Sequence, residues 1–336
     1  MKIPLGELRR TLERVLLEEG FEEERAGSCA LLFAEASRDG VHSHGLNRFP
    51  RFVRMIRNGC VDPQARAEPV GAAGALERWD GRRGPGNLNA QECMGRAIEL
   101  AREHGIGCVA LGNTNHWMRA GSYGWQAAEA GMIGICWTNT MPNLPPWGSA
   151  LPLLGNNPLV IAVPREGGHV VLDMAMSQFS YGALEGYAAR GEPLSVPGGF
   201  DANGALTTDP AAILESGRPL PIGYWKGSGL ALLLDLVAAT LAGGSATHQL
   251  RTEPDLETDL SQTFVAIAPG AAGGDGEGTV AEEVMRALQR ADGGARYPGE
   301  KVLEERRRSL AEGVVVDPDV WRWVSGPREN RDRPPG

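Results

Sequence analysis

Residues 43–51, Ser-His-Gly-Leu-Asn-Arg-Phe-Pro-Arg, place an imidazole and a guanidinium four positions apart at the start of a predicted helix. His44 lies in a glycine-flanked turn, and histidine is the side chain best suited to exchanging a proton near neutral pH. Arg48 falls on the predicted first helical turn, and a guanidinium grips a carboxylate by two parallel hydrogen bonds. Together they could bind a small acid with a reducible carbonyl. On spacing alone, the pair is more typical of a capped turn with two surface side chains.

Other polar side chains fall on predicted loops at element ends, where ligand sites tend to form. His116 follows one strand-like segment, Thr138 ends a second and Asp173 ends a third. Lys226 lies in Gly-Tyr-Trp-Lys-Gly-Ser-Gly before a long apolar run, where glycines allow close backbone approach and free N–H groups attract anions. An ordinary turn or cap explains each loop alone, but several together predict a ligand site.

Three histidines raise the alternative of a catalytic metal. His42 and His44 are two residues apart, His116 could be a third ligand, and three histidines can hold zinc. The pattern is weak, because His-x-His needs an extended backbone and the third ligand cannot be located from sequence. We therefore expect no metal, and keep a metal-dependent hydrolase as an alternative. A binding protein without activity is a further alternative, although intact His44, Asp173 and Lys226 argue against it.

Length, composition and charge exclude several classes of protein. The chain has 336 residues, 42% of them hydrophobic, enough for two domains or one large core. A net charge of −9 without a basic stripe makes nucleic acid and anionic membranes poor partners. Asp235 interrupts the longest apolar run, 230–241, which suits a buried helix, and no signal region is found at the N-terminus. The five scattered cysteines indicate reduced thiols and a cytoplasmic location.

Hydrophobic periodicity predicts helices at both ends of the chain and a mixture of strands and helices between them. The predicted helices at the ends run to Gly20 and over 23–38, 48–58 and 299–313. Between them we predict strands at 106–111, 133–138, 159–163, 170–173 and 263–268, and helices at 91–104, 120–130, 227–241 and 280–290. This pattern favours an α/β or α+β fold.

The common nucleotide-binding and catalytic motifs are absent. There is no G-x-x-x-x-G-K-[ST] loop, no G-x-S-x-G, no H-E-x-x-H and no G-x-G-x-x-G. The looser dinucleotide form ending in alanine begins at Gly105 and at Gly276. The first opens a predicted strand instead of following one, and the second carries Glu277, which would repel a pyrophosphate. A dinucleotide bound here would not use the ordinary Rossmann turn.

Six short segments, in this order along the chain, resemble the type 2 malate/L-lactate dehydrogenase family. They are Ser43-His44-Gly45, Asn115-His116, Gly155-Asn156-Asn157-Pro158, Asp173-Met174-Ala175, Gly223-Tyr224-Trp225-Lys226-Gly227 and Pro298-Gly299-Glu300. The similarity runs from residue 1 to about residue 324. That family is unrelated to the Rossmann-type lactate dehydrogenases, which agrees with the missing glycine motif.

The resemblance implies a helical domain and an α/β domain on a largely antiparallel sheet, with a nicotinamide cofactor bound between them. In this chain the helical domain would comprise 1–72 with 296–324 and carry His44, and the cofactor-binding α/β domain would comprise 73–295. The tail, 325–336, is rich in Pro, Arg and Asn and is predicted to be disordered. The resemblance also implies a homodimer with its sites near the subunit interface.

The resemblance further implies residue roles and a reaction. His44 matches the proton donor, and we add Asp173 as the carboxylate that orients it. The chemistry of the side chains suggests Ser43, Arg48, His116 and Thr138 as substrate contacts. Cofactor contacts are implied for His169, Val170, Val171, Leu172, Asp173, Met174, Ala175, Trp225, Lys226, Gly299, Glu300 and Lys301.

The expected reaction is reduction of a small 2-oxo acid, with NADH favoured over NADPH by resemblance alone. Conversion of 2,3-diketo-L-gulonate to 3-keto-L-gulonate is the first expectation. Another 2-oxo or cyclic imino acid, of the malate, lactate, ureidoglycolate or piperideine-2-carboxylate type, stays open.

Overall fold

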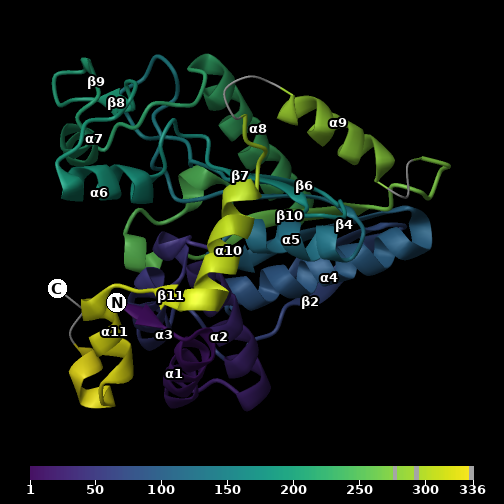
Figure 1. The fold of residues 1–336 in the computed structure, drawn as a ribbon, viewed down its shortest axis with the longest axis horizontal. Helices are drawn as coiled ribbons and strands as arrows, with labels where there is room; N and C mark the ends of the chain where they lie inside the picture. The colour runs from purple at the N-terminus through teal and green to yellow at the C-terminus, as the bar shows by residue number, and fades with distance from the viewer. Residues whose placement is uncertain (275–277, 291–294, 333–336) are drawn as a thin grey trace.

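A seven-stranded sheet forms the middle layer of the molecule (Figure 1). The computed structural model describes residues 1–274, 278–290 and 295–332. The strand order is β2-β3-β4-β10-β5-β6-β7, and all neighbours are antiparallel except β3 and β4. The strands are β2 Glu68–Ala73, β3 Leu76–Asp80, β4 Ile106–Thr114, β5 Ile133–Thr138, β6 Leu159–Val163, β7 Val170–Met174 and β10 Leu260–Ile267. The expected mixed fold on a largely antiparallel sheet is confirmed.

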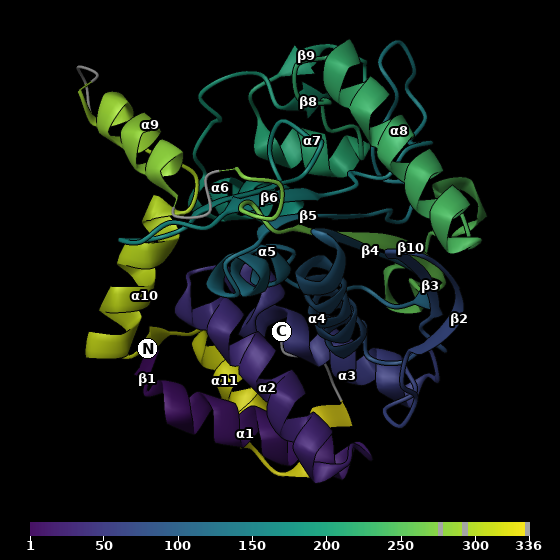
Figure 2. The same ribbon diagram turned by 90° about the vertical axis from the view of Figure 1, so that its right-hand side faces the viewer.

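Helices cover both faces of this sheet (Figure 2). α4 (Gly86–His104) and α5 (Gly121–Glu129) pack on one face, and α8 (Trp225–Ala242) packs across β4, β10 and β5 on the other. The burial pattern fits this arrangement, because β10 buries six of its eight residues, as a strand covered on both faces must. A small residue lets α4 approach β4, since a Cβ at Gly107 would lie 2.2 Å from the carbonyl oxygen of Ala97.

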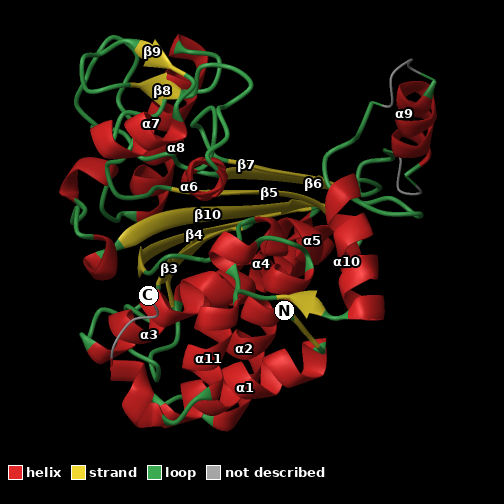
Figure 3. Cartoon of the chain, turned by 60° about the vertical axis from the view of Figure 1, so that its left-hand side comes forward, coloured by secondary structure: helices red, strands yellow, loops and turns green. Residues whose placement is uncertain are grey.

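A helical layer lies against α4 on the side away from the sheet (Figure 3). It combines the two ends of the chain, which are joined by the pairing of β1 (Lys2–Ile3) with β11 (Val314–Val315). Aromatic side chains fill its core, and the rings of Phe33 and Phe49 meet edge to face at 5.1 Å. Its helices are α1 Leu5–Glu18, α2 Glu23–Arg38, α3 Phe49–Arg57, α10 Glu300–Glu312 and α11 Pro318–Ser325.

The remaining elements are short or lie at the edge of the molecule. α6, α7 and the β8–β9 pair form a small group beyond β7, and α9 projects from the body in Figure 2. These elements are α6 Tyr181–Arg190, β8 Gly199–Phe200, β9 Leu206–Thr207, α7 Pro210–Ser216 and α9 Thr279–Gln289. The 3-10 helices are η1 His42–His44, η2 Leu46–Arg48, η3 Thr247–Gln249, η4 Pro254–Leu256 and η5 Arg328–Asp332.

α8 is the one helix in the described part of the chain whose length and composition would also suit a membrane span. Its inner face packs on the sheet, and its buried Asp235 accepts hydrogen bonds from Asn139 Nδ2 and Thr247 N, each at 2.9 Å. These contacts make it a helix of the folded protein. Its outer face, the α8 apolar face, leaves five side chains exposed: Leu230, Leu232, Leu233, Leu236 and Val237.

Two predicted boundaries differ from the structure. β2 begins at Glu68, inside the predicted helical domain of 1–72, because this exposed edge segment pairs with β3. The tail predicted to be disordered from residue 325 instead contains η5, where buried Arg331 donates to the Gly326 carbonyl oxygen at 2.7 Å and pairs with Glu18. This anchoring explains its order through residue 332, and 333–336 lie outside the described residues.

Candidate active site

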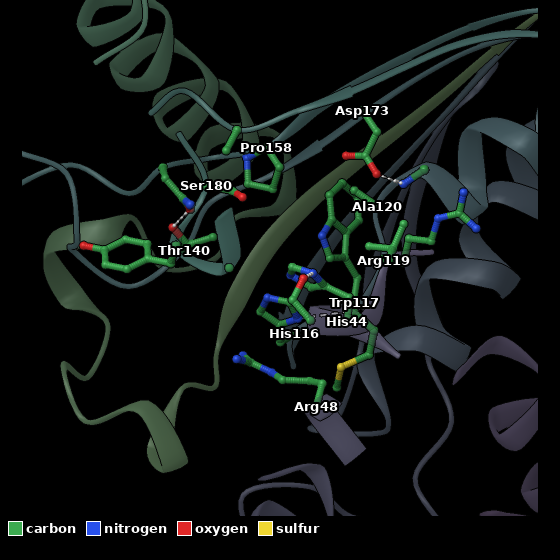
Figure 4. A pocket seen from close by; sticks show the side chains of 18 of the residues that line it. His44, Arg48, His116, Trp117, Arg119, Ala120, Thr140, Pro158, Asp173 and Ser180 are labelled. Atoms are coloured by element: carbon green, nitrogen blue, oxygen red, sulfur yellow. Dashed lines mark hydrogen bonds between the residues drawn. The ribbon is translucent and has the colours of Figure 1, made fainter. Parts of the chain in front are cut away.

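A cavity of about 750 Å³ lies where the helical layer meets the end of the sheet (Figure 4). Small-molecule and cofactor sites typically occupy about 300–1,000 Å³. Its walls come from segments far apart in the sequence: the η1–η2 turn, the loop before α5, the end of β7, the start of α6, the loop after η4 and the start of α10. It brings together nine of the predicted site residues: Ser43, His44, Arg48, His116, Val171, Leu172, Asp173, Ala175 and Gly299.

Gly45 lets the turn carrying His44 pack tightly against α2. A Cβ at Gly45 would lie 2.2 Å from Ser37 Oγ and 2.8 Å from Ser37 N, so no larger residue fits without movement. The same Ser37 hydroxyl accepts a hydrogen bond from Leu46 N at 2.8 Å. The short sequence Ser-His-Gly-Leu therefore fixes the imidazole at the cavity wall.

The imidazoles of His44 and His116 stack in the cavity, with ring centroids 5.6 Å apart and an interplanar angle of 20°. His116 Nδ1 accepts a hydrogen bond from Met118 N at 3.0 Å, so the neutral ring carries its proton on Nε2 and is a donor there. His44 Nδ1 lies 2.9 Å from Ser43 Oγ, which leaves its Nε2 for a ligand. The pair thus offers one fixed donor and one exchangeable proton.

Both rings are held neutral by their surroundings. Burial, with smaller contributions from Arg48 and Arg119, lowers the pKa of His44 to about 4. Burial also lowers the pKa of His116 well below its usual range, helped by the charges of Arg48 and Arg51. An anion bound beside Arg48 would oppose this effect and favour protonation of His44.

Two arginines and one glutamate form the end of the cavity next to His44. Arg48 precedes α3 and Arg51 lies one turn further on the same side of that helix. Arg48 Nη2 is 3.7 Å and Arg51 Nη2 is 3.6 Å from Oε2 of the buried Glu257. The Arg48 guanidinium has no hydrogen bond within the described chain, so its donors are available to a ligand carboxylate.

Asp173 does not contact His44, contrary to the expectation that it orients the imidazole. Its Oδ2 accepts a hydrogen bond from Gly121 N at 2.8 Å, and Figure 4 shows it on the opposite side of Arg119 and Trp117 from the histidine pair. Burial raises its pKa, against the opposing effects of Arg119 and the Gly121 N–H. The polar partner that orients His44 is Ser43.

Arg119 is held at the cavity by Asp39, whose carboxylate is completely buried. Arg119 Nη1 donates to Asp39 Oδ2 at 2.5 Å, Arg38 Nε donates to Oδ1 at 2.7 Å, and Arg306 donates to both oxygens at 2.9 and 2.7 Å. These hydrogen bonds hold the pKa of Asp39 well below its usual range, against its own desolvation. One carboxylate therefore links α2, α10 and the loop that carries His116.

The cavity wall near β7 and α10 has no Rossmann turn, and a helix N-terminus is its feature suited to a phosphate group. α10 begins there after Gly299, and helix N-termini attract phosphate groups, whereas the first N–H of α5, at Gly121, is already bonded to Asp173. Gly299 has φ +98°, and a Cβ there would lie 3.2 Å from Val171 N, so glycine allows this approach to β7. Apolar surface from Trp125 and Val302 completes the wall.

Several predicted contacts do not line the cavity in this chain. Thr138 is buried, with its hydroxyl donating to the Asn139 carbonyl oxygen at 2.8 Å, and the threonine that lines the cavity is Thr140. Trp225 is 65% exposed at the start of α8, next to Lys226. The others outside the lining are His169, Val170, Met174, Glu300 and Lys301.

The metal-dependent alternative lacks a ligand set in the described part of the chain. No group of three His, Cys, Asp or Glu side chains there converges on one point. His44 and His116 stack face to face, a geometry unlike two ligands pointing at one ion, and His42 is not among the residues lining the cavity.

Sequence reasoning missed Arg51, Arg119 and Glu257. The spacing of Arg48 and Arg51 could have revealed Arg51, because residues three apart share a helix face. Glu257 lies after a 3-10 helix and Arg119 in the turn before α5, far from His44 in sequence, and no local pattern marks either.

Comparison with known proteins assigns the chain to a family. A family model described as malate/L-lactate dehydrogenase matches residues 3–325. The 2,3-diketo-L-gulonate reductase of Citrobacter koseri is 45% identical over 327 residues, which cover 96% of this chain and 98% of the relative. The protein of the same name from Klebsiella pneumoniae is 45% identical over 330 residues, with the same coverage of each chain.

Solved structures agree with this assignment. Sulfolactate dehydrogenase from Methanocaldococcus jannaschii superimposes with a TM-score of 0.90 at 28% identity, covering 99% of this chain and 97% of that one. Δ1-piperideine-2-carboxylate reductase from Pseudomonas syringae gives a TM-score of 0.87 at 30% identity, covering 97% and 99%. The chain belongs to the malate/L-lactate dehydrogenase family, as its motifs indicated. These relatives are named as dehydrogenases and reductases of small organic acids.

Proposed function

We propose that this protein uses a reduced nicotinamide cofactor to reduce the ketone of a small 2-oxo acid, with His44 as the proton donor. The observation that carries the proposal is the convergence of three groups in one cavity. They are the His44 imidazole, the His116 ring stacked on it, and the Arg48 guanidinium, which has no hydrogen bond within the described chain. Arg48 can bind the carboxylate of the substrate, His116 can donate a hydrogen bond to its carbonyl oxygen, and His44 can transfer the proton.

The role of each residue follows from the hydrogen bonds it can make. Arg48 binds the substrate carboxylate and so aligns the adjacent ketone with the two rings. His116 donates its fixed Nε2–H to the carbonyl oxygen as negative charge develops there. His44 delivers its Nε2 proton to that oxygen, and Ser43 Oγ, bonded to Nδ1, keeps the ring in position.

For the cofactor, we propose NADH ahead of NADPH, on the family resemblance. When bound, the reduced nicotinamide supplies the hydride for the carbonyl carbon. Val171, Leu172, Asp173, Ala175 and Gly299 would hold it from the cavity wall. The other predicted contacts stay predictions: His169, Val170, Met174, Trp225, Lys226, Glu300 and Lys301.

For the substrate, the names of the curated relatives support 2,3-diketo-L-gulonate, reduced to 3-keto-L-gulonate. Arg48 and Arg51, which line the cavity, suit its carboxylate. Other 2-oxo or cyclic imino acids remain second candidates, because the structural neighbours include a piperideine-2-carboxylate reductase and a sulfolactate dehydrogenase.

We also propose a cytoplasmic homodimer. The α8 apolar face supports the dimer, because five exposed aliphatic side chains on one helix are costly to leave in water. Trp225 and Lys226 lie at the start of this helix, so any contact they make with cofactor would depend on that interface.

The direct test is a panel of 2-oxo acids and one cyclic imino acid, each offered with NADH and with NADPH, following the absorbance of the reduced cofactor. The panel contains 2,3-diketo-L-gulonate, pyruvate, oxaloacetate and piperideine-2-carboxylate. Oxidation of the cofactor that depends on at least one of these acids is expected. No turnover with any of them, together with no thermal stabilisation by either cofactor, would remove the reductase function.

A further inference from the structure

Arg48, Arg51 and Glu257 form a compact charged group at one end of the cavity, and two of its three members have no role so far. The side chains are largely enclosed, with 19%, 18% and 4% of their surface exposed, and all three line the cavity. Arg48 and Arg51 come from the start of α3, and Glu257 comes from the loop after η4, which packs against α3.

The hydrogen-bonding capacity of this group is unfilled. Glu257 Oε1 accepts from Met141 N at 3.3 Å, and Oε2 accepts no hydrogen bond within the described chain. Arg51 donates to the Pro254 carbonyl oxygen, but its buried Nε has no hydrogen-bond partner and lies 3.4 Å from Asp255 Oδ1. Arg51 Nε is the buried atom of this group without a hydrogen-bond partner, and buried polar groups are nearly always paired. With the open acceptor at Glu257 Oε2, it marks a place that a ligand in the cavity would fill.

Ion pairs elsewhere in the described chain are of two kinds, and some, such as Arg25–Glu92 at 3.6 Å, are long, whereas others are closed by short hydrogen bonds. Arg96 Nη2 lies 2.7 Å from Glu77 Oε1, and Arg306 donates to both oxygens of Asp39 at 2.9 and 2.7 Å. The two guanidiniums facing Glu257 stop 3.6 and 3.7 Å from the carboxylate. Contacts this long forgo the strong charge-assisted hydrogen bonds that a closed pair makes.

We propose that Arg51 joins Arg48 in binding the substrate carboxylate, and that Glu257 accepts a hydrogen bond from a hydroxyl on the carbon chain of the substrate. The site then selects hydroxylated 2-oxo acids over unsubstituted ones. The same carboxylate repels a second carboxylate, so it also selects against dicarboxylic 2-oxo acids such as oxaloacetate. This inference rests on the proposed function and names its substrate class.

Matched substrates that differ by one hydroxyl test the assignment of Glu257. The pairs are pyruvate with 3-hydroxypyruvate, and 2-oxobutanoate with 4-hydroxy-2-oxobutanoate. The wild type should favour the hydroxylated member in kcat/KM for at least one pair. In Glu257→Met the preference should shrink about 10- to 100-fold, as expected for losing a hydrogen bond to a charged group, and Glu257→Gln should restore part of it. Glu253→Gln, an exposed residue of the same loop, is the control.

The role of Arg51 in binding the carboxylate is tested by a change in KM that should be the same for all substrates, because all of them carry that carboxylate. Arg51→Gln should raise KM about tenfold or more for hydroxylated and unsubstituted acids alike, with a smaller effect on kcat. Arg54→Gln, on the same helix and also facing Asp255 but outside the cavity lining, is the matched control. Unchanged KM in Arg51→Gln would show that Arg51 does not bind substrate.

A binding measurement separates this inference from the proposed reaction. Calorimetric dissociation constants for L-lactate and L-glycerate, which also differ by one hydroxyl, should show the same preference and the same loss in Glu257→Met. That preference without any turnover would uphold the recognition site while refuting the reductase. Equal shifts for both acids in Glu257→Met, or no preference in the wild type, would show that Glu257 only balances the charge of the arginines and would overturn the inference.

Discussion

His44 illustrates how a buried side chain can be prepared for its reaction by the substrate itself. Burial and the charges of Arg48 and Arg119 lower its pKa to about 4, so it is neutral near pH 7. A substrate carboxylate on Arg48 offsets one of those charges and adds a negative one nearby. Binding and proton uptake by His44 are therefore coupled.

This coupling predicts a particular pH dependence of reduction. Because only protonated His44 can donate, kcat/KM should fall about tenfold per pH unit above the low pKa of the free enzyme. The fall in kcat should be centred at a higher pH, since kcat reports the substrate complex. pH–rate profiles with a saturating cofactor measure both. A kcat/KM that stays constant between about pH 5 and 8 would contradict a proton donated by His44.

At this scale the sequence predicts the residues that combine reactive chemistry with a local pattern. His44, Arg48 and His116 all reach the cavity as expected. Glu257 could not be predicted, because only the folded chain brings it opposite α3. Thr138, also predicted as a substrate contact, does not line the cavity, because its hydroxyl donates to the Asn139 carbonyl oxygen and Thr140 lies at the cavity wall.

At the scale of elements, the Asp39 carboxylate joins parts of the molecule that carry the site. It receives Arg38 from its own helix, Arg119 from the loop of His116, and Arg306 from α10. Arg306 also packs over the ring of Trp125, with 4.7 Å between its Cζ and the ring centroid. Loss of the carboxylate leaves three guanidiniums without their shared partner.

We therefore expect Asp39→Asn to destabilise the protein by about 3–5 kcal/mol, the usual cost of breaking a buried charge network. The native pKa of Asp39 is lowered, so its stabilising contribution is present above the pKa of an unfolded aspartate and is lost as the pH falls through its native value. The variant should therefore lose less stability than the wild type on acidification. Denaturant unfolding at neutral and acidic pH measures both, with Glu24→Gln on the exposed side of α2 as control. A loss within about 0.5 kcal/mol at neutral pH would rule out a stabilising network.

Secondary-structure prediction succeeded where hydrophobic periodicity was strong. α2, β5 and β6 have the predicted bounds, because each buries a regular set of apolar side chains. β2 was missed because all six of its residues are exposed and include a proline and a glycine, so only pairing with β3 makes it a strand. Whether such an edge segment forms a strand depends on its pairing with a neighbouring strand, which the local sequence does not encode.

At the scale of the whole molecule, the α8 apolar face predicts association. In the single chain, 57% of the Leu233 surface and 49% of the Leu236 surface are exposed at the middle of that face. A second copy would bury them, and symmetric pairing of one face is the commonest route to a dimer. The homodimer proposed for this protein would place the face at its interface.

Leu233→Glu tests this arrangement, because a buried charge opposes association. Light scattering during gel filtration should give a dimer for the wild type and a shift toward monomer for the variant. Leu17→Glu, at an exposed leucine of α1, should leave the dimer intact. A wild type that is monomeric at micromolar concentration, or a Leu233→Glu variant that stays fully dimeric, would place the interface elsewhere or remove it.

The layered fold explains why the reactive residues come from the N-terminal part of the chain and from its middle. The helical layer supplies His44 and Arg48, the loop before α5 supplies His116, and the end of β7 supplies Asp173. The cavity exists only where these layers meet, so a nicotinamide cofactor and a 2-oxo acid would be brought together at that junction. The proton donated by His44 is the central chemical claim of this arrangement.

Single-turnover reduction by the wild type and by His44→Gln, following the absorbance of the bound reduced cofactor, tests that claim most directly. Glutamine keeps a similar size and some hydrogen bonding but has no transferable proton. We expect the rate to fall by about 10²–10⁴, with the cofactor dissociation constant and the melting temperature close to those of the wild type. A variant that turns over within a factor of about three of the wild type, or a large loss in His116→Gln with little in His44→Gln, would contradict the assignment of His44 as the acid.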